Sequence, residues 1–386
     1  MNILYIANVR MPTSWAHGYQ IMKTCEGLVH SGVRVQLVVS DRRDPLIEQD
    51  AYSYYDVSHI FQTVRLSVTD LVCQVPLFFE KAAFMFERYT FMNSLRAFLP
   101  YLLPDAPIYV RDAYLAEQLL REKKRSVYFE VHSAQDAKVL HRLSGVKGLV
   151  CLTRSLAQDI IKTLPNARVT VIPDAVDIVT FNPSATREQA RAKLGLPSDV
   201  RIVTYGGNFS TYGKGKGLGL LDKAVEIVTK THPDLRLVLV GGTAEEFERM
   251  EGVKPSSTTM CVPFGPRTDL ALQYRAADVL AMPFPNTPHY ANAMSPLKMF
   301  EYMASGTAIV APDLPSVRDV LDEHLAIFHV ADDVVSLADA LRKAIDMGSD
   351  ARSAMGAKAQ ELVRSKYTWD ARGEAIKSFI ERCETA

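Results

Sequence analysis

Short runs of β-branched and other apolar residues alternate along the chain with longer amphipathic segments. In the first half, strands are predicted at 2–7, 33–39, 107–110, 126–131, 148–152 and 169–172, with a helix at 19–31 that Gly32 ends. A second round of predicted strands covers 201–205, 235–240, 258–262, 278–282, 307–311 and 326–330. This alternation is typical of parallel sheets whose strands are joined by right-handed helical crossovers.

The pattern therefore predicts an α/β protein with two doubly wound, parallel-sheet domains. We assign residues 1–175 to a first Rossmann-like domain, 176–199 to a linker and 200–367 to a second Rossmann-like domain. Ligands of open α/β sheets bind at the carboxyl ends of the strands. The two domains are expected to face each other across a cleft lined by these strand ends.

The composition is that of a globular protein without an overall electrostatic preference. Of the 386 residues, 48% are hydrophobic, and 44 Lys plus Arg balance 44 Asp plus Glu. No global field would attract nucleic acid, so a phosphate site must be local. The five cysteines include no CxxC pair and the histidines no HExxH motif. This argues against a metal site and for reduced thiols without disulfides.

The chain begins directly with an apolar strand, and no basic segment or cleavage site precedes it. No apolar run is long enough to span a bilayer. We therefore expect a cytoplasmic protein that is at most peripheral at the inner face of the membrane.

The most apolar part of the first domain outside its strands comprises residues 71–79 and 82–86. Such a segment could face a lipid acceptor or a membrane. An interfacial helix usually carries a face rich in Lys and Arg, and this segment offers only Lys81 and Arg88 beside two glutamates. We therefore prefer core packing as the interpretation.

Residues 295–306 read as one helix with well-marked ends. Ser295 is a favoured N-cap, Pro296 suits the first helical position, and Gly306 suits a left-handed C-terminal residue. At about 100° per residue, one arc carries the apolar side chains, and the opposite arc carries Lys298, Glu301, Tyr302 and Ser305. One face of the helix is therefore expected to pack in the core, and the other to contact a ligand or water.

Lys298 lies in the first turn of this helix, where the dipole disfavours a cation by about 0.3–1 kcal/mol. A bound anion would reverse that penalty, because the free amides of the turn and the ammonium group can together hold phosphate oxygens. Glu301, one turn further on, can accept two hydroxyl donors such as a ribose diol. By itself the pattern fits a solvated helix face equally well.

This helix resembles the nucleotide-sugar site of the family 4 glycosyltransferases, also called glycosyl transferases group 1, which have the GT-B fold. One branch of the family begins the helix with Ser-Pro-Leu-Lys, as at 295–298, and carries a glutamate at the place of Glu301. Much of the family has another glutamate eight residues earlier, where this chain has Ala293. The donor-binding residues implied here are Ser295, Pro296, Leu297, Lys298 and Glu301, with Tyr290, Asn292 and Met294 as possible substitutes for the missing carboxylate.

A glycine-rich loop at 205–217 follows the first strand of the second domain. It has neither the GxGxxG spacing of dinucleotide folds nor the spacing of a P-loop. The resembling family usually has Lys-Gly before the next helix, which matches Lys216 and Gly217, and an arginine upstream near the place of Asn208. Lys214 would then supply the second charge. A mobile solvated loop is the alternative.

The loop at 262–266 ends a predicted strand with the sequence Val-Pro-Phe-Gly-Pro. In the resembling family this loop sets its backbone, here Phe264 and Gly265, against the nucleobase. Proline and glycine occur in any loop, so the assignment rests on the position of this one between a strand and a helix.

Three residues of the first domain are candidates for the cleft, and two of them stand where the family has site residues. Gly18, between the first strand and helix, matches a loop that contacts the donor phosphates and the acceptor; a simple turn glycine is the alternative. His132 ends a strand and resembles a histidine at the sugar C6 hydroxyl, although most lone histidines are structural. Arg111 ends the preceding strand and is either a neighbour in the same cleft or a partner of Asp112 or Glu130.

The resemblance implies GT-B architecture and a glycosyltransferase of class EC 2.4. A Tyr-Thr-Trp step at 367–369 matches the family segment that returns to the first domain, so the helix at 368–386 is expected to pack there. The donor would be a nucleoside-diphosphate hexose or N-acetylhexosamine, and the acceptor a saccharide or lipid-linked molecule in cell-surface polysaccharide or glycoconjugate biosynthesis. Retention of configuration and independence of metals and cofactors are also implied.

Glycosyl transfer is mainly a problem of stabilising the diphosphate that leaves. Lys216, Lys298 and the first-turn amides are placed for that role, Glu301 would anchor the ribose, and His132 would orient the donor. A GT-B sugar-nucleotide epimerase or hydrolase remains an alternative, as does a catalytically silent nucleotide-binding partner protein, which Ala293 and Asn208 would suit. Neither domain has the glycine fingerprint of a nicotinamide oxidoreductase.

Overall fold

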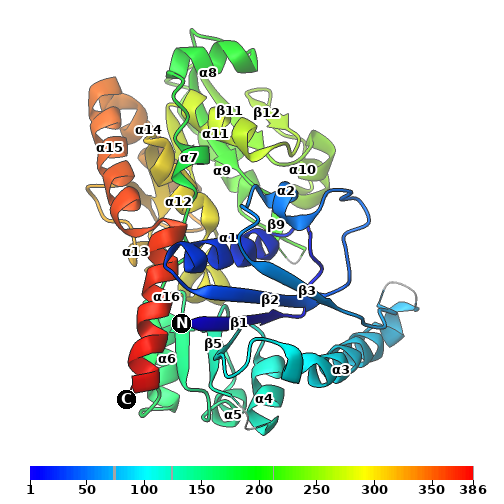
Figure 1. Ribbon diagram of the computed structural model, residues 1–386. Helices are drawn as coiled ribbons and strands as arrows, with labels where there is room; N and C mark the ends of the chain where they lie inside the picture. The colour runs from blue at the N-terminus through cyan, green and yellow to red at the C-terminus, as the bar shows by residue number, and fades with distance from the viewer. Residues whose placement is uncertain (73–74, 123–124, 212, 386) are drawn as a thin grey trace. The chain divides into compact units, whose positions relative to one another are not determined.

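The computed structural model describes residues 1–72, 75–122, 125–211 and 213–385. It divides into two compact units (Figure 1). Unit 1 comprises Met1–Asp174 and Trp369–Ala386, and unit 2 comprises Ala175–Thr368. The segment 176–199, predicted as a linker, folds into α7 (Ile178–Phe181) and α8 (Arg187–Leu194), which pack on α11 (Arg267–Ala276) within unit 2.

Within the described residues, unit 1 is built on a parallel sheet with the strand order β3-β2-β1-β4-β5-β6-β7. The strands are β1 (Asn2–Ala7), β2 (Arg34–Ser40), β3 (Gln62–Leu66), β4 (Ile108–Val110), β5 (Val127–Val131), β6 (Gly148–Cys151) and β7 (Val169–Val171). The sequence pattern located all of these except β3. This edge strand is only partly buried, so it lacks the continuous apolar run of a central strand.

The helices of unit 1 are α1 (Ala16–His30), α2 (Ala51–Tyr55), α3 (Glu80–Phe98), α4 (Ala113–Glu122), α5 (Ala137–Arg142), α6 (Arg154–Thr163) and α16 (Trp369–Thr385). The C-terminal helix α16 packs along α1 (Figure 1). Glycines allow this approach: a Cβ on Gly27 would lie 2.1 Å from the carbonyl oxygen of Trp369, and a Cβ on Gly373 would lie 2.2 Å from the carbonyl carbon of Gly27. Backbone contact between the two helices therefore fixes α16 on unit 1.

The sheet of unit 2 is also parallel, with the order β12-β11-β8-β13-β14-β15. Its strands are β8 (Arg201–Gly206), β11 (Leu235–Val240), β12 (Thr259–Val262), β13 (Val279–Ala281), β14 (Ala308–Pro312) and β15 (Ile327–His329). Further helices are α9 (Leu218–Thr229), α10 (Ala244–Glu251), α12 (Leu297–Ser305), α13 (Pro315–Arg318), α14 (Val334–Asp346) and α15 (Gly348–Lys366). The six predicted strands of this domain all form where the apolar runs placed them.

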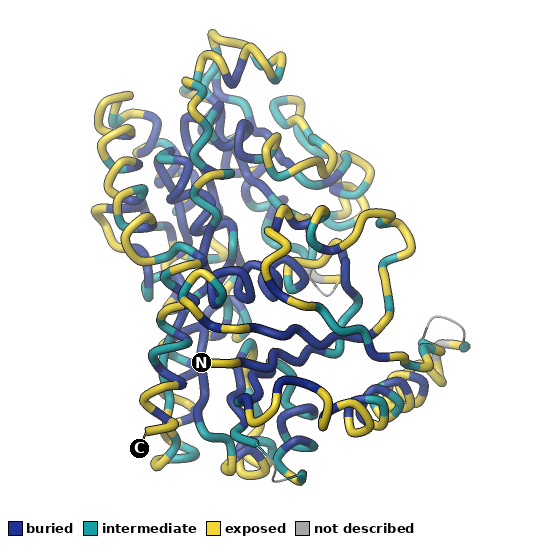
Figure 2. Tube along the Cα trace, in the orientation of Figure 1, coloured by how far each residue is buried: buried dark blue, intermediate teal, exposed yellow. Residues whose placement is uncertain are grey.

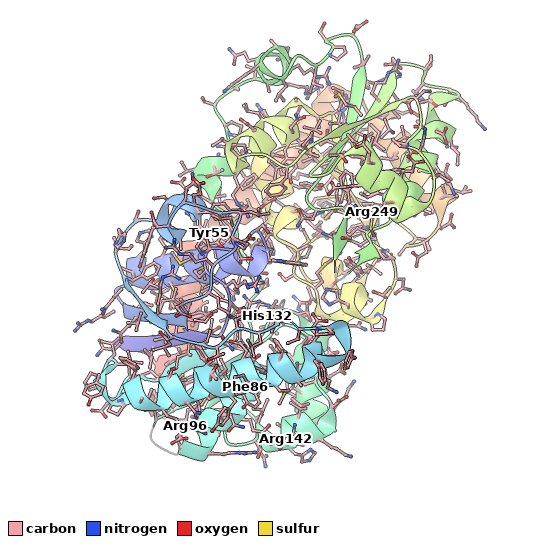
Figure 3. All side chains as sticks on the ribbon, turned by 90° about the vertical axis from the view of Figure 1, so that its right-hand side faces the viewer. Tyr55, Phe86, Arg96, His132, Arg142 and Arg249 are labelled. Carbon is pink, nitrogen blue, oxygen red and sulfur yellow. The ribbon has the colours of Figure 1, made fainter. Side chains whose placement is uncertain are left out.

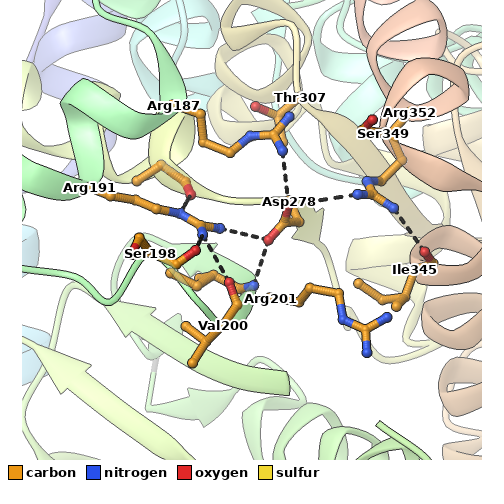
Figure 4. Close-up of polar contacts among 12 residues, drawn as sticks. Arg187, Arg191, Ser198, Val200, Arg201, Asp278, Thr307, Ile345, Ser349 and Arg352 are labelled. Carbon is orange, nitrogen blue, oxygen red and sulfur yellow. Dashed lines mark hydrogen bonds and ion pairs between the residues drawn. The ribbon is translucent and has the colours of Figure 1, made fainter. Parts of the chain in front are cut away.

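A cluster of charges holds the amino ends of β8 and β13 (Figure 4). The buried Asp278 accepts hydrogen bonds from Arg191 at 2.7 Å, Arg187 at 3.0 Å and the amide of Ile202 at 2.8 Å. Arg352 of α15 approaches the same carboxylate to 3.8 Å. One carboxylate thus ties α8 and α15 to the sheet, at the edge opposite the strand ends where ligands bind.

The prediction that the apolar segment of unit 1 packs in the core is wrong for most of its described residues; residues 73 and 74 lie outside them. Glu87, Phe91 and Leu95, which follow the segment on α3, are buried, but most of the segment itself lies at the surface (Figure 2). Its exposed large apolar side chains are Leu71, Phe78, Phe79, Phe84, Met85 and Phe86, and Tyr89, one turn further along α3, is also exposed. Apolar character does not bury a helix turn where no other element covers it. No helix in the described part of the chain is long and apolar enough to cross a bilayer.

Candidate functional site

Helix α12 begins one residue later than the sequence predicts. Pro296 rather than Ser295 is its N-cap residue, with extended backbone at ψ 126°, and no side chain caps the helix. The φ of Pro296, −76°, is the one its ring fixes, but its ψ lies outside the helical region, so Leu297 is the first helical residue. The C-terminal prediction is confirmed, because Gly306 adopts φ +70°.

The polar arc of α12 is buried, which excludes the solvated-face alternative. Lys298 is 8% and Glu301 5% exposed, while Tyr302 lies in the core and donates towards the strand backbone. The Nζ atom of Lys298 has no hydrogen-bond partner among the described residues. It lies 3.5 Å from the centre of the Tyr205 ring and 5.2 Å from that of Phe284. An ammonium group that contacts two aromatic rings but has no hydrogen-bond acceptor in the described part of the chain is poised for an anion.

A second amine lies close enough to interact electrostatically with Lys298. Burial, then repulsion by Lys216, holds the pKa of Lys298 well below its usual range. Burial lowers the pKa of Lys216 itself to about 8. Lys216 is positioned by Gly217, whose φ is +82° and where a Cβ would lie 2.1 Å from the carbonyl oxygen of Pro283. The two lysines predicted to hold a diphosphate are therefore brought together.

The other predicted residues of the glycine-rich loop contribute less. Asn208 is exposed, and its carbonyl accepts a hydrogen bond from the Tyr205 hydroxyl at 3.1 Å. Lys214 belongs to a short antiparallel ribbon of β9 (Ser210–Thr211) and β10 (Lys214–Gly215), and its side chain lies outside the described part of the structure. The charge predicted for Lys214 stays a prediction.

Glu301 has partners that the sequence analysis did not name. One carboxylate oxygen accepts a hydrogen bond from Arg267 at 2.8 Å, and the other accepts one from the Tyr274 hydroxyl at 3.3 Å. Each oxygen keeps a further lone pair for a ligand hydroxyl. Arg267 begins α11, where the dipole disfavours a cation just as it does at Lys298. That same signal could have identified it.

A cavity of about 190 Å³ opens at the carboxyl ends of β8, β11 and β12. Its lining includes Phe264 and Gly265 of the predicted nucleobase loop, together with Gly207 and Gly241. A Cβ on Gly207 would lie 3.2 Å from Nζ of Lys298, so the cavity wall adjoins the lysine. Apolar walls of this size beside a cation suit a flat base linked to a phosphate.

The segment before α12 forms a π-helical turn, His289–Ala293, rather than an irregular loop. Tyr290 is buried and stacks on Phe284 with ring centres 5.1 Å apart. Ala293 is buried, Met294 partly so, and Asn292 is exposed. Phe284 thus connects Tyr290 to Lys298.

In unit 1, His132 (labelled in Figure 3) follows β5, and both nitrogens of its ring have partners. Its Nδ1 lies 3.1 Å from a guanidinium nitrogen of Arg111, and its Nε2 lies 2.5 Å from Oε1 of Glu130. Arginine can only donate, so Nδ1 accepts and Nε2 carries the proton towards Glu130. Burial, then Arg111, lowers the pKa of His132. The imidazole is a neutral ring with both nitrogens engaged.

Glu130 is the centre of this network. Beside His132 it accepts hydrogen bonds from Gln20 at 2.7 Å, from Arg372 of α16 at 2.7 Å and from the Tyr109 hydroxyl. Burial alone would raise the pKa of Glu130, but Arg372, His132 and Arg111 hold it well below its usual range. The C-terminal helix therefore contributes a cation to the residues around His132.

Arg111 and Gly18 have structural partners as well. Arg111 donates to Gln20 at 2.6 Å, whereas the predicted alternative partner Asp112 pairs with Arg88 at 2.7 Å. The amide of Gly18 donates to the carbonyl of Trp15, and a Cβ on Gly18 would lie 2.0 Å from the Tyr55 hydroxyl oxygen. Close packing is thus sufficient reason for a glycine at position 18.

A family model described as glycosyl transferases group 1 matches residues 200–347. Unit 2 matches this family over most of its length. It carries Lys216, Lys298, Glu301 and the cavity, so the family predicted from residues 295–301 is confirmed. In the described part of the chain, no group of three or more His, Cys, Asp or Glu side chains could hold a metal ion.

Curated proteins similar to this chain are named D-inositol 3-phosphate glycosyltransferase. The protein of Kineococcus radiotolerans is 31% identical over 237 residues, which cover 56% of this chain and 52% of the relative. That of Corynebacterium jeikeium is 29% identical over 261 residues, covering 62% and 58%. The chain spans little more than half the length of these relatives.

Solved structures show the fold of the whole chain. Sucrose-phosphate synthase from Thermosynechococcus elongatus matches with a TM-score of 0.78 at 19% identity, over 100% of this chain and 99% of that one. HepE of Anabaena in complex with UDP and glucose matches with a TM-score of 0.69 at 13% identity, over 98% and 99%. The predicted GT-B fold with two Rossmann-like domains is therefore confirmed.

Proposed function

We propose that this protein transfers a sugar from a nucleoside-diphosphate sugar to a saccharide or lipid-linked acceptor. The observation that carries the proposal is the buried ammonium group of Lys298, which lacks a hydrogen-bond partner among the described residues and adjoins an apolar cavity. A diphosphate would supply the missing acceptor, and its base would fill the cavity. Structures that share the fold hold UDP and glucose or UDP-2-fluoro glucose, which supports a nucleotide-sugar donor.

The chemistry assigned to these residues is leaving-group stabilisation. Negative charge grows on the β-phosphate as the bond to the sugar breaks, and Lys298 and Lys216 would meet it in a site from which water is largely excluded. Glu301, oriented by Arg267 and Tyr274, would accept hydrogen bonds from the ribose hydroxyls. Two amines suffice to neutralise a diphosphate, which supports transfer without a metal or cofactor.

His132 takes a positioning role in this scheme. Both of its ring nitrogens are engaged by Arg111 and Glu130, so it is poorly suited to remove a proton from an acceptor. An inverting enzyme needs such a base. The arrangement therefore supports retention of configuration. As part of the same proposal, the sugar is a hexose or N-acetylhexosamine, and the enzyme acts in surface polysaccharide or glycoconjugate biosynthesis.

A thermal-shift panel of UDP, GDP, ADP and NAD in EDTA tests this function. One nucleoside diphosphate is expected to raise the melting temperature, since a ligand at 100 times its Kd stabilises the folded state by about 2.7 kcal/mol. Glu301→Ala should abolish the shift, and Glu301→Gln should weaken it. The exposed Glu323→Gln serves as the control and should leave the shift intact.

A rise in melting temperature with NAD alone, or no rise with any of the four nucleotides, would overturn the proposal. Product analysis with the stabilising donor then separates the alternatives: free sugar or an epimer without acceptor indicates a hydrolase or epimerase, and binding without turnover indicates a silent partner protein.

We also propose peripheral contact of unit 1 with the cytoplasmic face of a membrane through the aromatic surface of α3. This surface consists of Phe78 and Phe79, directly before α3, and of Met85, Phe86 and Tyr89 on α3, where Figure 3 labels Phe86. Phe78 is 78% exposed. Tyrosine and phenylalanine suit the boundary between headgroups and acyl chains. The exposed charges next to this surface are those of Glu80 and Lys81, and they cancel.

Vesicle flotation tests this contact. The protein is expected to float with phosphatidylcholine vesicles, with little gain from added anionic lipid because the surface is locally neutral. The double variant Phe78→Ser, Phe86→Ser should stay in the dense fraction. Val179→Ser, which changes an exposed apolar side chain of unit 2, is the matched control. Equal flotation of both variants, or none of the unmodified protein, would contradict the proposal.

A further inference from the structure

Gln273 is a buried amide with an unmet hydrogen bond. It lies on α11 in the wall of the cavity beside Lys298, and it is only 7% exposed. Its Oε1 atom is buried and accepts no hydrogen bond from any described residue. Buried side-chain oxygens are nearly always paired, because an unmade hydrogen bond costs stability. A ligand that donates a hydrogen bond to Oε1 of Gln273 would remove this cost, so the unpaired atom points to a ligand.

The surroundings indicate what kind of ligand would pair with it. Val240, Val262 and Leu270 give the cavity apolar sides, and the backbones of Gly207 and Gly241 approach each other closely. A flat heterocycle fits between such walls. Asp269, one turn earlier on α11, also lines the cavity. Both side chains offer acceptor atoms, so the ligand edge that faces them must carry N–H donors.

We propose that Gln273 reads the hydrogen-bonding edge of the nucleobase and is the specificity-determining residue for the base of the donor. The inference rests on the proposed function, since it assigns the cavity to the base of a nucleoside diphosphate. Uracil, guanine, adenine and cytosine all carry an N–H donor on this edge, but each places it differently relative to its acceptors. An amide fixed on a helix therefore pairs well with one of them and leaves unpaired groups with the others.

The opposite effects of one substitution on stability and on binding test this role. Gln273→Leu removes an unpaired polar atom, so it is expected to raise the melting temperature of the ligand-free protein by about 2–4 °C. It should also weaken the binding of the preferred nucleoside diphosphate by roughly tenfold. The affinities for the four nucleoside diphosphates should then lie within about threefold of one another. Gln273→Glu keeps the acceptor and removes the donor, which identifies the atom that makes the contact.

Gln360→Leu is the matched control. Its amide donates to the side chain of Asn182 at 2.9 Å and to the carbonyl of Ala304 at 2.7 Å, so its loss should lower the melting temperature and leave base preference unchanged. Calorimetric titration with UDP, GDP, ADP and CDP supplies the affinities. An unchanged ranking of bases in Gln273→Leu overturns this inference alone. Failure of all four to bind the unmodified protein overturns the proposed function as well.

Discussion

Lys298→Met is expected to lower the rate of sugar transfer by about 10²–10³-fold, the usual effect of removing one group that stabilises developing negative charge. The same variant should melt at a higher temperature than the unmodified protein in the absence of ligand. The ammonium group is buried, makes no hydrogen bond with a described residue, and is desolvated beside Lys216. Methionine fills a similar volume without a charge to desolvate.

Initial rates with a saturating donor and melting curves of the free protein measure the two effects. The matched control is Lys223→Met, because Lys223 is an exposed lysine on α9 of the same unit; it should change neither quantity. Turnover within twofold of the unmodified protein would remove Lys298 from the site. Loss of turnover together with a lower melting temperature would instead indicate a structural role.

Asp278→Asn is expected to destabilise unit 2 by about 3–5 kcal/mol, the cost of breaking a buried ion pair by removing one partner. Arg191 and Arg352 are each buried and share this carboxylate with Arg187 (Figure 4). Asparagine keeps one acceptor oxygen but leaves the guanidinium groups without the charge that compensates them. Urea unfolding followed by circular dichroism would measure the loss.

Asp234→Asn provides the comparison for this prediction. Asp234 pairs with Arg201 near the same edge of the sheet, but both side chains are about one-third exposed. Exposed pairs contribute about 0–1 kcal/mol. An equal effect of the two substitutions would mean that burial does not set the strength of the Asp278 cluster.

The candidate site was only partly accessible from the sequence. Lys298 and Glu301 are identified by a local pattern, a cation in a first helical turn followed by a carboxylate one turn later. Arg267 carries the same local signal and was missed. Gln273 carries none, because its significance depends on the cavity that three strand ends form around it. From the sequence, the polar face of α12 could equally bind a ligand or face solvent. Its burial in the structure makes it a binding-site candidate.

His132 shows the same limit in unit 1. Its position after a strand predicted an edge location, but not that Arg111 and Glu130 would engage both ring nitrogens. Glu130 in turn is held by Arg372, which follows it by 242 positions. No pattern of neighbouring residues reports a contact across such a separation.

Local patterns in the sequence predict every strand of the two parallel sheets except β3, the helix that Gly306 ends and the family that unit 2 matches. Strand periodicity, turn residues and short motifs are local, so they survive without knowledge of the fold. Three features are known only from the folded structure: the N-terminal part of α3 is exposed, Asp278 pairs with three arginines, and Gln273 lines a cavity. Burial depends on what covers a residue, and the covering elements come from distant parts of the chain.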